Sequence, residues 1–337
     1  MAEKTDDTKP YEQIGVIGAG AWGTALAAIA ARAGRSVSLW AREPEVVESI
    51  ARTRQNGPFL PGIVLPPMAC TGDMEAATAG AQALLVVAPA QHLRAILLEV
   101  SLHAPAGIPL VICAKGFERT SGKLVTEVFD ETAPGFEPAI LSGPSFARDA
   151  AQGLPTAVTI AARLPIARRL QASLGHATFR PYAGDDLLGV ALGGAAKNVY
   201  AIACGIVDGM GLGESARSAL LARGFAELRR LGKALGARPG TLMGLSGLGD
   251  LVLTATSAQS RNYRFGREVG KGRKPDELTA PGQPLAEGVA TAPALVIRAR
   301  QEKIELPVAE TVAHVLDGTL PLDEAVLRLM SRPLKPE

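Results

Sequence analysis

A single lysine stands in the middle of a long apolar segment of this 337-residue chain. Residues 190–207 read as a helix whose one formal charge is Lys197, followed directly by Asn198. Burial of an unpaired charge is unfavourable, and it lowers the pKa of a lysine towards the range useful for proton transfer. Lys197 is therefore a candidate for acid–base chemistry. The alternative is a lysine whose ammonium group reaches solvent from a tightly packed helix.

Two adjacent glycines, Gly193 and Gly194, precede Lys197 by one helical turn. Each glycine in a helix interior lowers helix stability by about 1 kcal/mol relative to alanine. Their presence predicts that another segment of the protein approaches this face of the helix closely.

A glycine-rich turn near the start of the chain is a second candidate. Residues 13–17 predict a short strand, residues 24–33 predict an alanine-rich helix, and Gly18, Gly20 and Gly23 lie between them. In this context the glycines form a dinucleotide fingerprint. The first permits a tight turn, the second lets backbone N–H groups approach a pyrophosphate, and the third lets helix and sheet pack closely. An ordinary glycine-rich loop is the alternative.

The next predicted strand, residues 36–40, ends where such a fold distinguishes NAD from NADP. An acidic residue there accepts hydrogen bonds from the ribose of NAD, whereas arginine accommodates the 2′-phosphate of NADP. The residues are Ala41, Arg42 and Glu43. Because Arg42 comes first, we predict that NADP is favoured, with NAD as the alternative because Glu43 is adjacent.

These residues require a sheet to position them. Strand-like runs alternate with helical patterns at residues 83–88, 109–114, 139–141, 155–161 and 178–182. The alternation predicts an α/β fold with a Rossmann-type, doubly wound, mostly parallel sheet. Ligands of such sheets bind beyond the carboxyl ends of the strands.

The strand signal stops after residue 182, and helical patterns continue to the end of the chain, including one that begins near Glu287. We therefore expect an all-helical C-terminal domain. The predicted organisation is a disordered tail (1–11), a dinucleotide-binding domain (12–190) and a helical substrate and catalytic domain (191–337).

Two predicted strand ends carry groups suited to a substrate. Lys115 ends the run 109–114 and is placed to meet an anion, although strand-end lysines are often only solvated. Ser145 and the backbone near Gly143 suit a substrate oxygen or, alternatively, ordinary turn chemistry.

The C-terminal domain adds a carboxylate and an arginine. Asp250 follows a glycine-rich turn and suits orienting a protonated lysine or accepting a substrate hydroxyl, with a helix cap as the alternative. Ser260, Arg261 and Asn262 stand at a predicted helix start, where an arginine fork and helix N–H groups suit a phosphate. A solvated Arg261 is the alternative.

Composition narrows the function class. The net charge is +2 and aromatic residues make up 4%, so nucleic-acid binding gains no support. The 3 cysteines are widely spaced, which suits reduced thiols, and neither they nor the 4 histidines have metal-ligand spacing. The N-terminus lacks the apolar core of a signal peptide, and no apolar run approaches the roughly 20 residues of a membrane span. We expect a soluble, cytoplasmic protein without bound metal.

In their order and number, the motifs closely resemble those of the bacterial NAD(P)-dependent glycerol-3-phosphate dehydrogenases, from about residue 14 to about residue 318. The matching segments are GAGAWGTALA at 18–27, AKG at 114–116, SGPSFA at 142–147, GGAAKN at 193–198, GLGDLVLT at 247–254, SRN at 260–262 and AEG at 286–288.

The resemblance implies reversible hydride transfer between NAD(P)H and dihydroxyacetone phosphate, which gives sn-glycerol 3-phosphate for phospholipid synthesis, in a homodimer. It implies that Lys197 is the proton donor and acceptor. The substrate residues that it implies are Lys115, Gly143, Ser145, Lys197, Asp250, Ser260, Arg261 and Asn262. The cofactor residues are Ala21, Trp22, Arg42, Lys115, Ala147, Arg261 and Glu287, beside the three fingerprint glycines.

Two residues depart from the family pattern, which often has serine in place of Ala21 and a second basic residue in place of Glu43. The first departure leaves the backbone N–H available to a phosphate. The second bears on the choice between NADP and NAD. Two rival functions are a dehydrogenase of the same plan acting on a hydroxy acid or sugar acid phosphate, and a catalytically silent sensor of the dinucleotide pool. A sensor would need the fingerprint but not Lys115, Lys197, Asp250 and Arg261 together.

Overall fold

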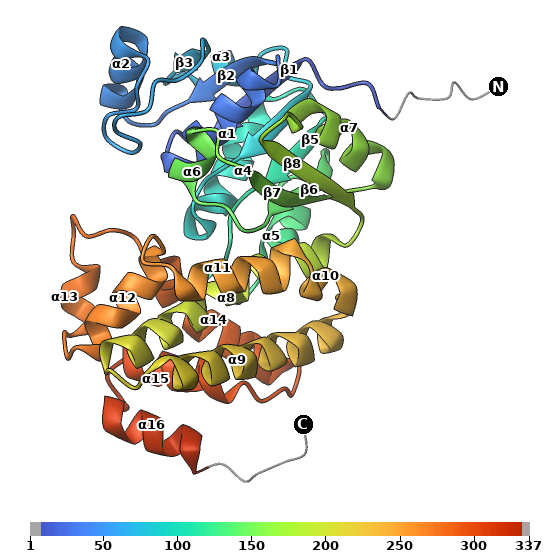
Figure 1. The fold of residues 1–337 in the computed structure, drawn as a ribbon. Helices are drawn as coiled ribbons and strands as arrows, with labels where there is room; N and C mark the ends of the chain where they lie inside the picture. Colours follow the sequence, from blue (N-terminus) through green and yellow to red (C-terminus); the bar gives the residue numbers. More distant parts are fainter. Residues whose placement is uncertain (1–7, 332–337) are drawn as a thin grey trace. The chain divides into compact units, whose positions relative to one another are not determined.

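A computed structural model describes residues 8–331 of the chain (Figure 1). The chain divides into two compact units. The first contains the residues up to 115 together with 125–191, and the second contains 116–124 together with the residues from 192 onward. The boundary at 191/192 falls inside a helix, and the short segment 116–124 leaves the first unit and returns to it. A Cβ atom on Gly122 would lie 3.4 Å from Ile297 Cγ2, so this part of the segment lies close to other residues of the second unit.

The first unit is built on one sheet of eight strands in the order β3-β2-β1-β4-β5-β6-β7-β8. The strands are β1 (Gln13–Ile17), β2 (Ser36–Trp40), β3 (Ala69–Thr71), β4 (Ala83–Val86), β5 (Pro109–Ile112), β6 (Glu137–Ser142), β7 (Thr156–Ala161) and β8 (Phe179–Gly184). All neighbouring pairs are parallel except β6 and β7. The predicted mostly parallel Rossmann-type sheet is therefore confirmed, and its strand order reverses at β1.

Helices cover both faces of this sheet. They are α1 (Ala21–Arg32), α2 (Pro44–Thr53), α3 (Met74–Thr78), the 3₁₀ turn η1 (Ala90–His92), α4 (Leu93–His103), α5 (Val125–Thr132), α6 (Ala147–Ala151) and α7 (Leu164–Leu174). Alternate strand residues such as Val16 and Leu85 join the buried core of α1, α6 and α7. Residues of the other parity, such as Ile112 and Ile140, lie on the side of α5. This alternation is the period-2 pattern of strands with two buried faces.

The register aligns the carboxyl ends of the central strands. Ile17 pairs with Trp40 on one side and with Val86 on the other, and Ile112 pairs with Val86 and Ile140. Residues that follow these positions therefore lie along one edge of the sheet. That edge is where parallel sheets bind their ligands.

The predicted tail ends earlier than residue 11. The expectation for residues 1–7 lies outside the described part of the chain. Tyr11 is buried, and its backbone N–H donates to Ser173 Oγ at 2.7 Å. Arg169 also stacks over the Tyr11 ring at 4.0 Å. These contacts hold Tyr11 against the first unit. The polar sequence around Tyr11 did not indicate this.

Within the described part of the second unit, the regular elements are helical, apart from one antiparallel bridge between Phe117 and Leu124. They are α8 (Leu187–Gly209), whose first residues belong to the first unit, α9 (Glu214–Leu235), α10 (Pro239–Met243), the π-helical turn η2 (Leu245–Gly249), α11 (Asp250–Thr256), α12 (Arg261–Gly270), α13 (Pro275–Thr279), α14 (Glu287–Gln301), α15 (Pro307–Leu316) and α16 (Leu322–Met330). The helical C-terminal domain is thus confirmed.

Helix α8 corrects one expectation. It is long and apolar enough to cross a membrane by length and composition, so the expected absence of such a run is wrong. Within the protein, 89% of its most apolar window is buried, as in the core helix of a globular protein. The sequence predicted a helix over residues 190–207, whereas the helix begins three residues earlier and ends two residues later.

Four glycines bring α8 and α12 into backbone contact. A Cβ atom on Gly205 or Gly209 would overlap backbone carbonyl oxygens of α12, and one on Gly266 or Gly270 would overlap those of α8. Because a backbone cannot yield as a side chain can, alanine does not fit at these positions. The glycines therefore set the separation between the helix of Lys197 and the helix that begins with Arg261.

Candidate functional site

The fingerprint turn, residues 18–23, has two glycines that the chain itself requires. Gly18 has φ +110°, and a Cβ there would lie 2.7 Å from the carbonyl oxygen of Val87. A Cβ on Gly23 would overlap the carbonyl oxygen of Gly18. Gly20 differs from both, because no atom lies within 4 Å of the position of its missing Cβ. Gly18 and Gly23 thus shape the turn, and Gly20 leaves open space beside it.

That open space adjoins the start of α1. Gly20 is the N-cap without a side-chain cap, and no acidic residue stands in the first turn. The N–H groups of Ala21, Trp22 and Gly23 have no acceptor within the helix, and the helix dipole favours an anion at this end. A pyrophosphate fits both the space and the donors. Trp22 packs against the core, and its Nε1 is buried without a hydrogen-bond partner among the described residues.

A buried asparagine braces the fingerprint turn from a distant loop. Asn56 Nδ2 donates to the carbonyl oxygen of Ala19 at 2.7 Å and to Thr24 Oγ1 at 2.8 Å. Its Oδ1 accepts from the N–H of Phe59 at 3.1 Å. The sequence analysis did not single out Asn56, since nothing local distinguishes it from a solvated loop asparagine.

The end of β2 carries the two residues that bear on the choice of dinucleotide. Arg42 is exposed, and its Nη2 lies 2.7 Å from Glu43 Oε1. The basic side chain predicted to meet a 2′-phosphate is therefore engaged by its acidic neighbour.

Three predicted substrate residues lie together at the ends of β5 and β6. Lys115 Nζ donates to the carbonyl oxygen of Gly143 at 3.3 Å, and Ser145 Oγ donates to the same oxygen at 3.1 Å. Gly143 has φ +154°, and a Cβ there would lie 2.8 Å from Val158 Cα. The antiparallel strand β7 thus accounts for this glycine. Ala147, predicted to contact the cofactor, is the first residue of α6, which packs against α1.

In the second unit, Lys197, Asp250 and Thr254 form what we call the lysine cluster. Lys197 Nζ donates to Asp250 Oδ1 and, at 3.0 Å, to Thr254 Oγ1. Thr254 Oγ1 donates in turn to Asp250 Oδ1 at 3.3 Å. Lys197 is 6% exposed and Asp250 is 0% exposed. The alternative of a lysine that reaches solvent is therefore wrong. The buried ammonium is held by a carboxylate, as a buried charge requires.

The backbone before Asp250 is pressed against α8. A Cβ on Gly193 would lie 2.6 Å from the carbonyl oxygen of Ser246, which confirms the predicted close approach at this glycine. Ser246 belongs to the π-helical turn η2, and its Oγ is buried without a partner among the described residues. The N-cap of α11 is Gly249, so Asp250 is not the helix cap. Its side chain is directed instead to Lys197.

Next to the lysine cluster, two amides connect three helices. Asn262 Nδ2 donates to Asn198 Oδ1 at 2.9 Å, and Asn262 Oδ1 accepts from the N–H of Gly288 at 2.9 Å. Gly288 follows Glu287, the first residue of α14 and a predicted cofactor residue. Asn262 is thus a buried link between these helices, and its predicted substrate contact stays a prediction.

Arg261 and Ser260 occupy the start of α12. Ser260 is the N-cap, and its Oγ accepts from the N–H of Tyr263 at 3.2 Å. Arg261 is exposed and forms no ion pair within the part of the chain that the structure describes. A free guanidinium at a helix N-terminus suits an anionic group.

Glu227 of α9 is a buried carboxylate that sequence reasoning missed, and it lies beside Tyr200 of α8, three residues after Lys197. Glu227 accepts from the N–H groups of Val308 at 2.7 Å and Ala309 at 3.2 Å, at the start of α15. Tyr200 of α8 donates its hydroxyl to Glu227 at 3.4 Å. Burial raises the pKa of Glu227 to about 7, against the lowering effect of these hydrogen bonds and of Arg230. A polar residue in a helical pattern gave no sign of this position.

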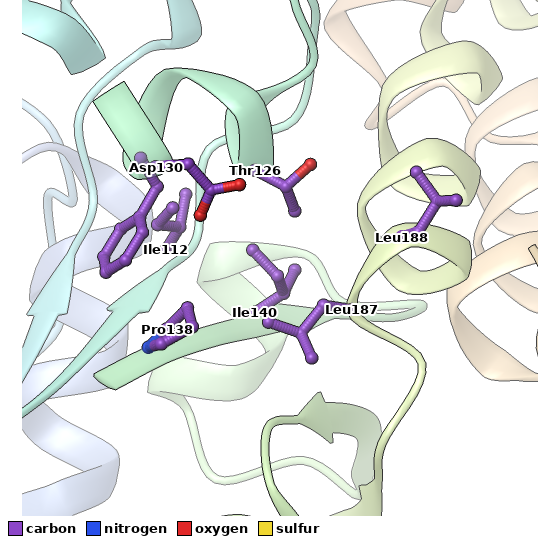
Figure 2. Close-up of a pocket in the computed structure, with 8 residues that line it drawn as sticks. Ile112, Thr126, Asp130, Pro138, Ile140, Leu187 and Leu188 are labelled. Atoms are coloured by element: carbon purple, nitrogen blue, oxygen red, sulfur yellow. The ribbon is translucent and has the colours of Figure 1, made fainter. Parts of the chain in front are cut away.

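Two cavities of the first unit lie away from the predicted residues. One of about 180 Å³ opens beside β5, β6 and α5 (Figure 2) and is lined by Ile112, Thr126, Phe129, Asp130, Pro138, Ile140, Leu187 and Leu188. Another of about 290 Å³ is lined by the end of α2 and residues 65–70. Neither includes a predicted site residue. Residues 8–331 hold no group of three or more His, Cys, Asp or Glu side chains arranged for a metal. All three cysteines are free thiols, as predicted.

Family models match both units. The N-terminal model of NAD-dependent glycerol-3-phosphate dehydrogenase matches residues 13–166, and the C-terminal model matches residues 186–327. The two family models therefore match separate stretches of the chain, which together cover most of both units.

Full-length relatives agree with the family models. A glycerol-3-phosphate dehydrogenase [NAD(P)+] of Parvibaculum lavamentivorans is 52% identical over 98% of this chain and 99% of its own length. One from Bradyrhizobium sp. (strain BTAi1) is 54% identical over 97% of this chain and 99% of its own. The crystal structure of glycerol-3-phosphate dehydrogenase from Coxiella burnetii, 35% identical, superposes with a TM-score of 0.91 and covers 96% of this chain and 99% of its own.

Proposed function

Because this chain belongs to the NAD-dependent glycerol-3-phosphate dehydrogenase family, we propose that Lys197 is the proton donor and acceptor of its reaction. The chain is an NAD(P)-dependent oxidoreductase that reduces dihydroxyacetone phosphate to glycerol 3-phosphate. This family membership argues against both rival functions, the dehydrogenase acting on a hydroxy acid or sugar acid phosphate and the catalytically silent sensor. Our proposal further includes a role in phospholipid synthesis, a cytoplasmic location and a homodimer, which the family resemblance favours.

The first unit supplies the groups that would hold the dinucleotide. The N–H groups that follow Gly20 have no acceptor within α1 and would take the pyrophosphate, and Arg42 would lie at the ribose. When bound, NAD(P)H supplies a hydride to the carbonyl carbon of the substrate. With Arg42 at this position we propose NADP as the favoured form. Lys115 and Ser145 would bind substrate oxygens from the same strand edge.

The single observation that carries the catalytic proposal is the burial of Lys197 against Asp250 and Thr254. Reduction of a carbonyl builds negative charge on its oxygen, and a fixed ammonium stabilises that charge and then donates a proton. Asp250 favours the protonated lysine, and both partners restrict the direction of its N–H groups. In the oxidation of glycerol 3-phosphate, the neutral amine would accept the hydroxyl proton.

Arg261 would bind the phosphate of the substrate. It is the exposed cation at the start of α12, and no acidic side chain among residues 8–331 neutralises it. Ser260 fixes the helix start beneath it, and Asn262 fixes α12 relative to α8 and α14. A fork of N–H donors on a positioned helix end is well suited to phosphate oxygens.

The test of this proposal is the initial rate of NADPH and NADH oxidation with dihydroxyacetone phosphate, for the native protein and for Lys197→Met. We expect rapid turnover by the native protein and almost none by the variant, with unchanged NADPH binding. Near-normal turnover by the variant would remove Lys197 from the mechanism. Absence of turnover by native protein that binds NADPH would overturn the assigned reaction itself.

A further inference from the structure

The segment between β2 and α2 is fixed on both sides of Arg42 and Glu43. Ala41 is fully buried, and its N–H donates to the carbonyl oxygen of Thr71 at 2.9 Å. Trp40 Nε1 donates to the carbonyl oxygen of Gly72 at 3.0 Å. Glu43 is the N-cap of α2, with its carbonyl oxygen accepting from Val46 at 3.0 Å. The backbone thus presents both side chains at a defined place on the strand edge.

The two side chains oppose one another in charge. Arg42 Nε lies 3.1 Å and Nη2 lies 2.7 Å from the same oxygen, Glu43 Oε1. The Arg42 side chain is 72% exposed and that of Glu43 is 25% exposed. Exposed pairs of this kind add little net stability, so an incoming anion can displace one partner from the other. The N-terminus of α2 also favours the negative charge of Glu43 after the pair separates.

We infer that Glu43 is a specificity-determining residue that restrains Arg42 and thereby lets the site accept both NADH and NADPH. The inference rests on the proposed function, in which the adenosine ribose lies at the end of β2. A 2′-phosphate draws Arg42 away from Glu43 and is repelled by the carboxylate. A 2′-hydroxyl donates to the carboxylate, and Arg42 then remains paired. Glu43 therefore weakens NADPH binding and strengthens NADH binding. The preference for NADPH is smaller than it would be if Arg42 were present without Glu43.

Equilibrium binding of NADP⁺ and NAD⁺, measured by isothermal titration calorimetry without substrate, tests this inference separately from turnover. The key variant is Glu43→Gln, which keeps the size and backbone of the N-cap residue. We expect it to bind NADP⁺ about 3- to 10-fold more tightly and NAD⁺ about 2- to 5-fold more weakly, as expected for loss of one partly exposed charge. Arg42→Gln should weaken NADP⁺ by about tenfold and change NAD⁺ by less than twofold.

The matched control is Glu48→Gln. Glu48 stands on the same helix, pairs with Arg52 at 3.7 Å and is exposed, so its removal changes net charge equally. A change in the NADP⁺ to NAD⁺ affinity ratio for Glu48→Gln as large as that for Glu43→Gln would reduce the effect to bulk charge and overturn the inference. So would an unchanged ratio in Glu43→Gln.

The double variant Arg42→Gln/Glu43→Gln separates restraint from simple repulsion. If Glu43 acts partly by holding Arg42, removing Glu43 should improve NADP⁺ binding less when Arg42 is absent. If Glu43→Gln improves NADP⁺ affinity equally with Arg42 present and with Arg42→Gln, Glu43 acts only by repelling the 2′-phosphate, and its restraint of Arg42 is overturned. Failure of the proposed function is seen elsewhere, as absence of dihydroxyacetone phosphate reduction by the native protein, so the two results cannot be confused.

Discussion

The fingerprint turn presents backbone N–H groups beside open space, whereas the lysine cluster encloses its charges among side chains. Gly20 has no neighbour within 4 Å of its missing Cβ, and Asp250 is fully buried. A backbone donor needs no side chain and suits a ligand that arrives and leaves with its own charge. A buried ammonium must have a permanent partner, since an isolated charge in the interior is strongly unfavourable. The two regions therefore respond to substitution in different ways.

The largest effect should come from the lysine cluster, where one substitution removes both chemistry and charge balance. Lys197→Met is expected to lower kcat by about 10³-fold or more, because it removes both charge stabilisation and proton transfer. It should also lower the free energy of unfolding by about 3–5 kcal/mol, because the buried carboxylate of Asp250 loses the cation that balances its charge. Steady-state rates and denaturant unfolding measure the two effects.

The double variant Lys197→Met/Asp250→Asn tests whether the effect on kcat can be separated from the effect on stability. It should recover much of the stability and none of the rate. Lys233→Met, at an exposed position of α9, is the control for loss of a lysine. Recovery of rate in the double variant would mean that the charge of Lys197 matters only for folding.

Two glycines of the fingerprint turn should differ from each other as sharply. Gly23→Ala pushes a methyl group into the carbonyl oxygen of Gly18 and should lower the free energy of unfolding by about 2–3 kcal/mol. Gly20→Ala meets no atom of the protein, so stability should change by less than about 0.5 kcal/mol. Its NADPH affinity should nevertheless fall by about tenfold or more, or about 1.4 kcal/mol. Thermal unfolding measures the stability of both variants, and NADPH titration measures their affinity. An unchanged NADPH affinity in Gly20→Ala would exclude pyrophosphate binding at this turn.

A pH experiment extends the comparison to the second buried carboxylate near α8. Burial raises the pKa of Glu227 to about 7 from 4.5. Between pH 4.5 and about 7, Glu227 therefore stays protonated in the folded protein but is ionised in the unfolded chain. The stability contribution is complete below pH 4.5 and is lost as pH rises through about 7. Over that range the loss is on the order of 3 kcal/mol.

Unfolding free energies between pH 5 and 8 should therefore decline with pH in the native protein, and Glu227→Gln should flatten the decline. Tyr200 on α8 and Arg230 on α9 face the same carboxylate and should be left unchanged in this experiment. An identical slope in the variant would assign the decline to other groups.

At Arg261, where the charge is exposed, the effect should be confined to substrate binding. Arg261→Ala is expected to raise the KM for dihydroxyacetone phosphate by about 10- to 100-fold with little change in kcat, because the phosphate pair is lost in ground and transition states alike. Stability should hardly change. Arg264→Ala, one turn further on the same helix and hydrogen-bonded to Ala258, is the control. An unchanged KM would exclude Arg261 from the phosphate site.

The same contrast explains what could be predicted from the sequence. The fingerprint turn is a local pattern, since its glycines, strand and helix are contiguous, and the sheet follows from the alternation of strands and helices. Lys197 was identifiable as a charge in an apolar helix. Its pairing with Asp250 joins residues separated by 53 positions, which a single sequence supports only through the family resemblance.

Other features depend on tertiary packing alone. Asn56 and Glu227 are polar residues whose burial is decided by distant backbone N–H and carbonyl groups. The antiparallel placement of β7 carries no signal in its own composition, since a strand reads alike in either direction. The membership of residues 116–124 in the second unit likewise depends on tertiary packing, such as the close approach of Gly122 to Ile297.

The apolar length of α8 has a consequence for synthesis of the chain. Its partners η2, α12 and the start of α14 all follow it in sequence, so the helix leaves the ribosome well before they exist. At about 5–20 residues per second, the wait until Gly288 is made lasts several seconds or more. During that interval the segment has the length and hydropathy that the membrane-insertion machinery recognises. Lys197 stands near its centre, where a charge adds about 2.5–3.5 kcal/mol to the free energy of insertion. The residue proposed for catalysis thus also disfavours diversion of the nascent helix into a bilayer.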